Sequence, residues 1–365
     1  MQLAEQRMQA TALGLGATDY PYYTGSSGSW VTTGPGAWTS GFFPGSLWLL
    51  HRATKQAAYE SEAENWQAGI ESQDTNTGTQ DLGFMIFDSY GNGFEQTHDA
   101  AYKQVVLTAA ASLATRYSPV VGAIRSWGSA SSKQFTVIVD NLMDLELLLW
   151  ASEHGGPKSD GQIALTDALT TLRDFVRPDG STIHVVNYDP TTGAIDSTSD
   201  DGTTWARGQA WAVHGFTMLY QYTHDPRMLS AAEEVANWWV ANLPADGVPY
   251  SNFEPADPAT EPVDSSAAAI AASGLIELAH LVRDPALRSS YLASARTSLT
   301  TLTSPSYLSS GTDNAAVLLH GTDNIGAGIV DTGLSYGDYY LLEGLLRLDP
   351  DLGRQAAHAA QTALR

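Results

Sequence analysis

The chain contains no cysteine, and this absence removes several kinds of chemistry. Disulfide bonds, thiolate nucleophiles and cysteine-ligated zinc sites are excluded, although the cellular compartment stays open. Cations are scarce as well, since 18 Lys and Arg stand against 40 Asp and Glu, for a formal net charge of -22. Nucleic acids and anionic membrane surfaces are bound by basic patches, so neither is an expected partner. One buried arginine can still recognise an anionic small substrate.

Long apolar runs are also missing. No stretch approaches the roughly 20 apolar residues that a membrane-spanning helix needs. Residues 1–8 are amphipathic and form no signal-peptide core, so we expect no signal peptide and a cytoplasmic location, unless a leader has been removed. No proline-rich, glutamine-rich or charged linker divides the chain, which predicts a single domain over residues 1–365.

Helical periodicity dominates what is present. Apolar residues recur at spacings of three and four, and glycines and prolines fall between these runs. The pattern predicts an all-α fold of about twelve antiparallel helices with long loops, which suits a closed ring better than a solenoid. The expected helices cover residues 1–14, a piece near 82–90, and residues 45–53, 57–70, 100–117, 141–152, 164–176, 205–222, 228–242, 265–281, 285–302, 337–348 and 353–364.

One small hairpin is expected as well. Residues 181–193 alternate apolar and polar side chains and then reach a turn at 189–193. His184 lies within the alternating strand, where a lone histidine is more often structural than functional. The nine histidines include no His-x-x-x-His or His-Glu-x-x-His pattern, so we expect neither a metal site nor a cofactor.

Residues 205–211 (Trp-Ala-Arg-Gly-Gln-Ala-Trp) place one arginine between two indoles. An arginine fork can bind a carboxylate through two hydrogen bonds, and an indole offers a flat face to a sugar ring. On a helix Arg207 and Trp211 share a face, while Trp205 lies elsewhere. In the alternative interpretation, two core tryptophans flank an arginine that pairs with a structural aspartate. The segment alone leaves both open.

Two aspartates precede apolar runs, Asp81 before residues 82–87 and Asp140 before residues 141–150. Either can be an ordinary helix N-cap. If these helices start at one rim of a ring, however, the two carboxylates converge there. A helix N-terminus lowers the pKa of a carboxyl, whereas burial and a second carboxylate raise it. Asp144 lies one turn after Asp140 and can share its face, while Glu146 faces away toward solvent or another helix.

A nucleophile-elbow pattern, Gly-x-Ser-x-Gly, occurs at residues 333–337. We reject it, because the elbow needs an acid and a histidine downstream and a sheet of alternating strands. Too little chain follows, and such strands are missing. The segment is instead expected to be a transition from loop to helix. The sequence also carries no Walker or Gly-x-Gly-x-x-Gly loop.

Several segments in a specific order support a family resemblance. The chain resembles the unsaturated glucuronyl hydrolases of glycoside hydrolase family 88 across nearly its whole length. Each segment alone is weak, but the order and spacing together are highly specific. The segments are residues 38–48, 81–84, 126–127, 140–147, 179–186 with 188–190, 205–211, 243–249, 264–270 and 336–340.

The resemblance implies an (α/α)6 barrel that removes the 4,5-unsaturated uronic acid from the non-reducing end of oligosaccharides made by polysaccharide lyases. It implies hydration of the C4=C5 enol ether, with Asp140 as acid and base and Asp81 as the assisting carboxylate. The positions that match the sugar-binding residues of the family are Trp38, Trp127, His184, Arg207 and Trp211.

The chain departs from the family pattern in places, which affects the expected substrate preference. Gln80 stands beside Asp81 where members have histidine, and we include it among the substrate-binding candidates. Residues 197–199 and 251–253 also differ. Residues 319–324, which in relatives read the next sugar and its sulfation, contain no Lys or Arg, which disfavours a strongly sulfated neighbour.

Two alternative functions stay open from the sequence. One is an unsaturated rhamnogalacturonyl hydrolase, which acts on a related unsaturated uronide. The other is a barrel that binds uronides without turning them over. In each case the expected partner is an unsaturated uronic-acid oligosaccharide, with no obligate protein partner.

Overall fold

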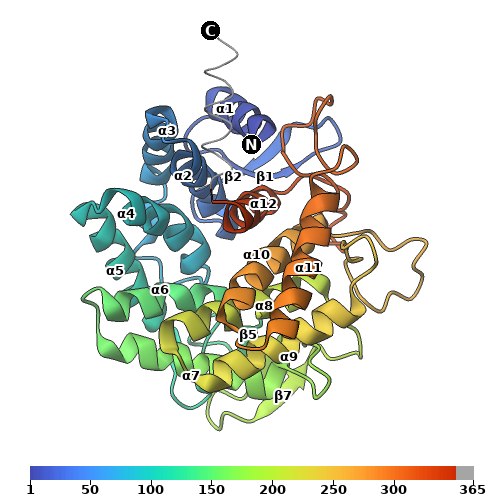
Figure 1. The fold of residues 1–365 in the computed structure, drawn as a ribbon. Coiled ribbons are helices and arrows are strands. Elements are labelled where there is room, and N and C mark those ends of the chain that lie inside the picture. Colours follow the sequence, from blue (N-terminus) through green and yellow to red (C-terminus); the bar gives the residue numbers. More distant parts are fainter. Residues whose placement is uncertain (351–365) are drawn as a thin grey trace.

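The computed structural model describes residues 1–350, in which six inner helices form a closed ring. They are α2 (Phe42–Thr54), the π-helix η3 (Gly83–Gly91), α6 (Asn141–Glu153), α8 (Ala206–Thr223), α10 (Ser265–Leu281) and α12 (Ser335–Leu348). Each contacts the next, and α12 returns to contact α2. In Figure 1 the blue α2 accordingly lies beside the red α12. The (α/α)6 barrel is therefore confirmed.

An outer layer of helices covers this ring, each packed on the inner helix that precedes or follows it in sequence. Burial explains the two layers. The inner α10 buries every residue from 265 to 276, whereas outer helices bury one stripe at helical spacing, as Tyr291, Ala295 and Leu302 show. The outer helices are α3 (Ala57–Ala68), α5 (Ala100–Ala114), α7 (Lys158–Phe175), α9 (Pro226–Asn242) and α11 (Pro285–Leu302).

Most of the expected helices are confirmed, including α1 (Gln2–Gly14), which contacts α2. The helix predicted for residues 353–364 lies outside the described residues. The prediction for 164–176 began too late, because α7 starts at Lys158 with a polar first turn that carries no apolar signal. A short helix that was not predicted separately, α4 (Asn92–Thr97), follows η3. None of the helices described within residues 1–350 has the length and apolar character needed to cross a membrane.

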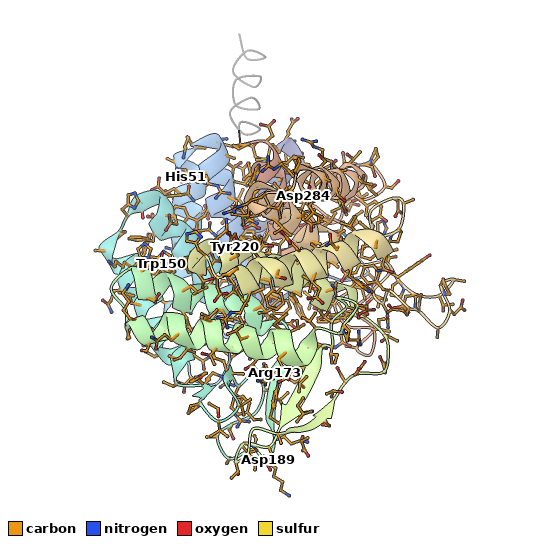
Figure 2. The ribbon with its side chains drawn as sticks, turned by 60° about the horizontal axis from the view of Figure 1, so that its bottom comes forward. His51, Trp150, Arg173, Asp189, Tyr220 and Asp284 are labelled. Carbon is orange, nitrogen blue, oxygen red and sulfur yellow. The ribbon has the colours of Figure 1, made fainter. Side chains whose placement is uncertain are left out.

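Short strands occur in the segments that connect the helices. The predicted hairpin is confirmed as β6 (Val185–Tyr188) paired antiparallel with β7 (Ile195–Thr198), and Asp189 at its turn projects from the molecule in Figure 2. The sequence did not predict β5 (Phe135–Ile138), which joins the edge of β6. It also missed the pairs β1 (Tyr20–Thr24) with β2 (Trp30–Thr33) and β3 (Tyr117–Ser118) with β4 (Ala123–Ile124). These strands are too short to show a clear alternation.

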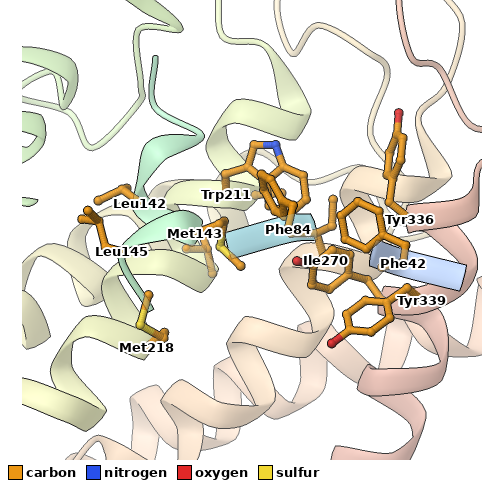
Figure 3. Close-up of a cluster of buried hydrophobic side chains, with 14 of the residues drawn as sticks. Phe42, Phe84, Leu142, Met143, Leu145, Trp211, Met218, Ile270, Tyr336 and Tyr339 are labelled. Atoms are coloured by element: carbon orange, nitrogen blue, oxygen red, sulfur yellow. The ribbon is translucent and has the colours of Figure 1, made fainter. Parts of the chain in front are cut away.

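An aromatic cluster fills the middle of the ring (Figure 3). The Phe84 ring centroid lies 5.1 Å from that of Trp211 and 5.5 Å from that of Phe42. Phe42 in turn lies 5.9 Å from Tyr336. These side chains come from η3, α8, α2 and α12, so inner helices on different sides of the ring meet here. The cluster includes the candidate Trp211, and the candidate Trp38 contacts it through Tyr336.

Candidate active site

The first turns of the inner helices meet at one end of the barrel. Asp264, the N-cap of α10, pairs with Arg207 in the first turn of α8. Arg207 also lies over the ring of Tyr336, in the first turn of α12. At the start of η3, the amide of Gly83 donates to Asp144 in the first turn of α6. The candidates at or next to these helix starts are Trp38, Gln80, Asp81, Asp140 and Arg207, and Trp211 lies one turn after Arg207 in α8.

Asp140 occupies the N-cap position of α6, yet its side chain makes no capping hydrogen bond. Its Oδ2 is buried and has no hydrogen-bond partner within residues 1–350. The nearest ionisable partner is His184, whose Nε2 lies 3.5 Å from that oxygen. An aspartate held at a helix start without capping it is available for other chemistry.

Asp81 is held through both of its oxygens. Oδ2 accepts a hydrogen bond of 2.7 Å from the Thr79 hydroxyl, and Oδ1 accepts one of 2.9 Å from Nε2 of Gln80. Burial raises the pKa of Asp81 to about 6, the Thr79 hydrogen bond opposes this, and the negative charge of Asp140 adds to the rise. The two carboxylates, far apart in the chain, are therefore close enough to interact electrostatically.

Asp144 positions these two carboxylates relative to each other. Its Oδ1 accepts from the amides of Gly83 at 2.8 Å and Phe84 at 3.2 Å, which ties the start of η3 to α6. The approach is close, since a Cβ on Gly83 would stand 2.5 Å from the Asp144 Cα. Burial holds the pKa of Asp144 well above its usual value. Sequence reasoning placed Asp144 on the face of Asp140 but not in this bracing role.

His184 links the hairpin to the carboxylates. Besides its contact with Asp140, its ring centroid lies 4.3 Å from that of Trp205 and 6.1 Å from that of Trp127. Trp127 is 49% exposed, which is unusual for an indole in this chain. The structure thus brings His184 and Trp127 together at the end of the barrel where Asp140 lies.

Arg207 is buried, and its terminal nitrogens are occupied by the protein. Nη1 donates to Asp264 Oδ2 at 3.2 Å and also to the Thr322 carbonyl, while Nη2 donates to the Asp323 carbonyl at 2.8 Å. The guanidinium also stacks 4.5 Å from the ring of Trp205. An arginine paired with a structural aspartate was one of the two interpretations of this segment. The arginine also anchors the loop at residues 319–324.

The two remaining tryptophan candidates, Trp211 and Trp38, differ in how deeply they are buried. Trp211 is fully buried and packs on Phe84 and Tyr340, so it forms part of the floor. Trp38 is only partly buried, and its ring lies 4.9 Å from that of Tyr336.

Sequence reasoning missed the residues that surround Arg207. Tyr336 donates from its hydroxyl to Asp323 Oδ1 at 2.9 Å, and Tyr22 donates to Oδ2 of the same carboxylate at 2.6 Å. Asp264 occurred in a motif segment without a role of its own, and in the structure it also caps α10 by accepting from the Ser266 amide at 3.0 Å. Tyr336 occurred in a motif segment without any sign of which partner it would meet.

The structure also bears on the Gly-x-Ser-x-Gly pattern at residues 333–337 and on possible metal-binding groups. Ser335 is the first residue of α12 and follows a loop, as expected from the sequence. Within residues 1–350, no group of three or more carboxylate and imidazole side chains is arranged to hold a metal ion.

Known proteins resemble this chain in sequence and in fold. It is 42% identical over 321 residues to an unsaturated glucuronyl hydrolase of Formosa agariphila, covering 85% of this chain and 79% of that protein. A solved structure of an unsaturated glucuronyl hydrolase specific for heparin has a TM-score of 0.90 and 34% identity, covering 95% of each chain. Another, of a UGL variant with dGlcA-Glc-Rha-Glc, has a TM-score of 0.90 and 30% identity over 96% of each chain. No family model matches.

Proposed function

Since the chain belongs to the unsaturated glucuronyl hydrolase family, we propose that it removes the 4,5-unsaturated uronic acid from the non-reducing end of lyase-generated oligosaccharides. The chain would act as one catalytic domain. The observation that carries the proposal is the meeting of Asp81 and Asp140 at one end of the ring, beside His184.

The reaction is a hydration followed by opening of the ring. Asp140 donates a proton to C4 of the enol ether, and positive charge develops at C5 and the ring oxygen. Water then adds at C5 and gives up a proton to the Asp140 carboxylate, which restores the acid. The resulting hemiketal opens and releases the aglycone. Because no glycosidic bond is displaced directly, the separation of the two carboxylates does not predict retention or inversion.

The surrounding residues support this chemistry in different ways. The buried Oδ2 of Asp140, free of protein donors within residues 1–350, is available to the substrate. Asp81, when ionised, stabilises the developing cation. Trp127, half-exposed beside His184, offers a stacking face for a sugar. Arg207 supplies a fixed positive charge that interacts with Asp140 rather than a free fork for the substrate carboxylate.

The decisive variant is Asp140→Asn. We expect hydrolysis of unsaturated disaccharides, followed as loss of the near-ultraviolet enol absorbance, to fall by roughly a thousandfold or more, because the proton donor is lost. Asp313→Asn, at an exposed loop position, is the matched control and is expected to keep the wild-type rate. Full activity of folded Asp140→Asn would rule out the mechanism.

The two alternatives give different results in the same assay. An unsaturated rhamnogalacturonyl hydrolase would prefer pectin-derived over glycosaminoglycan-derived unsaturated disaccharides when both are offered. A non-catalytic barrel would bind uronides saturably without any loss of enol absorbance. Against the second alternative stands the presence of both carboxylates, with Asp81 held by Thr79 and Gln80 and Asp140 lying 3.5 Å from His184.

A further inference from the structure

An open pocket of about 650 Å³ lies beside the loops that carry Asp81 and Trp127. Thr77 and Gly78, just before Asp81, form one part of its lining, and residues 128–130, just after Trp127, form another. Arg116 and Arg125 line it too, and no Asp or Glu does. In a chain with 40 acidic and 18 basic residues, a pocket with two arginines and no carboxylate is a marked local reversal of charge. We call it the Arg116–Arg125 pocket.

Arg116 builds the frame of the pocket. Its Nη1 donates to the Thr77 carbonyl at 2.6 Å, and its Nη2 donates to the Ser126 carbonyl at 2.9 Å. Nε donates to the Arg125 carbonyl at 2.8 Å. The guanidinium therefore joins the two site loops, but all of its acceptors are neutral carbonyls. Its positive charge is not cancelled by a bonded carboxylate.

Arg125 carries the donors that remain free. Its side chain is 7% exposed in total, and the guanidinium lies 4.2 Å from the centroid of the Phe135 ring, which fixes its plane. Nη1 donates to the Gln134 carbonyl at 2.7 Å, whereas Nε and Nη2 have no acceptor among residues 1–350. These two N–H groups form one edge of the guanidinium fork, the edge that binds a carboxylate or a sulfate through paired hydrogen bonds.

The two charges act on each other. Neither arginine forms an ion pair in the described part of the chain, unlike Arg177, Arg207 and Arg347. Burial lowers the pKa of Arg116, the positive charge of Arg125 lowers it further, and the negative charge of Asp81, which makes no ion pair with it, opposes both. Two neighbouring cations without a contacting counter-ion favour the binding of an anion from solution.

We propose that the Arg116–Arg125 pocket binds an anionic group, a carboxylate or a sulfate ester, on the part of the oligosaccharide that follows the terminal unsaturated sugar. The inference rests on the proposed function. Trp127 connects the two places, because its ring lies edge-on to that of His184, at 6.1 Å, while the residues after it line the pocket. A chain of sugars that stacks on Trp127 can thus reach Arg125. The loop at residues 319–324 contains no Lys or Arg, so it offers no permanent positive charge for a negative aglycone.

The test compares Arg125→Gln with wild type on matched substrates. These are an unsaturated disaccharide with a neutral reducing-end sugar, and unsaturated tetrasaccharides whose third sugar carries either a carboxylate or a sulfate. We expect KM for at least one anionic tetrasaccharide to rise by about tenfold or more with kcat unchanged, and kinetics on the disaccharide to stay within about twofold. The substrate affected more identifies the preferred anion.

Controls separate the pocket from a general loss of charge or fold. Arg227→Gln removes the same charge from an exposed arginine that pairs with Asp225, and it is expected to change nothing. Arg125→Lys keeps the charge and is expected to recover part of the affinity. Raising the ionic strength should weaken binding of the anionic tetrasaccharides only. Equal changes on all three substrates, or no change on any, would overturn the proposal.

A binding measurement distinguishes failure of this inference from failure of the proposed function. Calorimetry with a saturated tetrasaccharide that carries a uronate on its third sugar requires no turnover. Binding to wild type that weakens in Arg125→Gln supports the pocket even if no hydrolysis is seen. Equal binding to both proteins, or no binding to wild type, contradicts the pocket even if hydrolysis is fast.

Discussion

Burial has the largest influence on the pKa of Asp81, and its carboxylate is held by two neighbouring donors, Thr79 and Gln80. Each donates to one oxygen of the carboxylate, and the hydroxyl of Thr79 lowers a pKa that burial and Asp140 raise. With a pKa of about 6, Asp81 is mostly ionised at neutral pH and becomes neutral as the pH falls through that value. If the ionised form supports the cationic transition state, activity is lost on the acidic side of pH 6.

Thr79→Val tests this assignment. Removing the hydroxyl removes a contact that favours the charged form, so the pKa of Asp81 rises, and the acidic limb of the kcat/KM profile is expected to move up by roughly one pH unit. Thr79→Ser keeps the hydroxyl and is the control, with an unshifted limb. An unshifted limb in Thr79→Val would show that Asp81 does not set it.

At the scale of elements, the start of η3 is the most constrained place in the site. Gly83 lets η3 approach α6 until the Asp144 carboxylate can accept from two of its amides. A backbone contact this close leaves no room for a side chain. The π-helical form of η3 is consistent with a segment shaped by its neighbours, since such helices are rare and occur often at functional sites.

Gly83→Ala tests the role of this contact. Its Cβ would stand 2.5 Å from the Asp144 Cα, and neither backbone can move away freely. We expect the free energy of unfolding to fall by about 1–3 kcal/mol in denaturant titration, with a lower kcat because Asp81 moves relative to Asp140. Gly344→Ala, whose nearest neighbour would be a Leu299 methyl at 3.5 Å, is the control and should be neutral or mildly stabilising.

At the scale of the whole molecule, a second polar cluster closes the ring away from the candidate site. Glu343 of α12 accepts from Ser273 of α10 at 2.6 Å and lies 3.2 Å from His214 of α8. Arg347, one turn later, pairs with Glu343 at 3.3 Å. Burial alone would raise the pKa of Glu343, but Arg347 and then His214 hold it well below its usual value.

Glu343→Gln is therefore expected to destabilise the barrel as a whole. Removing Glu343 leaves the partly buried Arg347 with only its longer pair to Glu277, at 3.8 Å, at a cost on the order of 2 kcal/mol in unfolding free energy near neutral pH. Because the folded pKa is depressed, the contribution is present above the usual glutamate pKa and disappears as the pH falls below it. Glu60→Gln, in the more exposed pair with His51, should cost less than about 1 kcal/mol. Equal effects would contradict this account.

The local spacing of apolar residues predicted most of the helices, but not the layer to which each belongs. The run 265–281 was predicted with the observed bounds, because apolar residues recur at helical spacing along its whole length. The start of α7 was missed, since its polar first turn looks like a loop. Strands such as β5 were missed because their pairing partner lies far along the chain.

The sequence by itself determined an all-α fold, and its ordered motifs, through the family resemblance, indicated a barrel and which carboxylates to examine. Only the tertiary structure decided how those carboxylates are held. Whether Asp140 caps its helix, and whether Arg207 has a free fork, depends on atoms contributed by loops more than 40 residues away, such as His184 and Asp264. The spacing of apolar residues indicates the side of its own helix on which a residue lies. It carries no information on which distant donor will meet that residue, because this depends on how the ring closes.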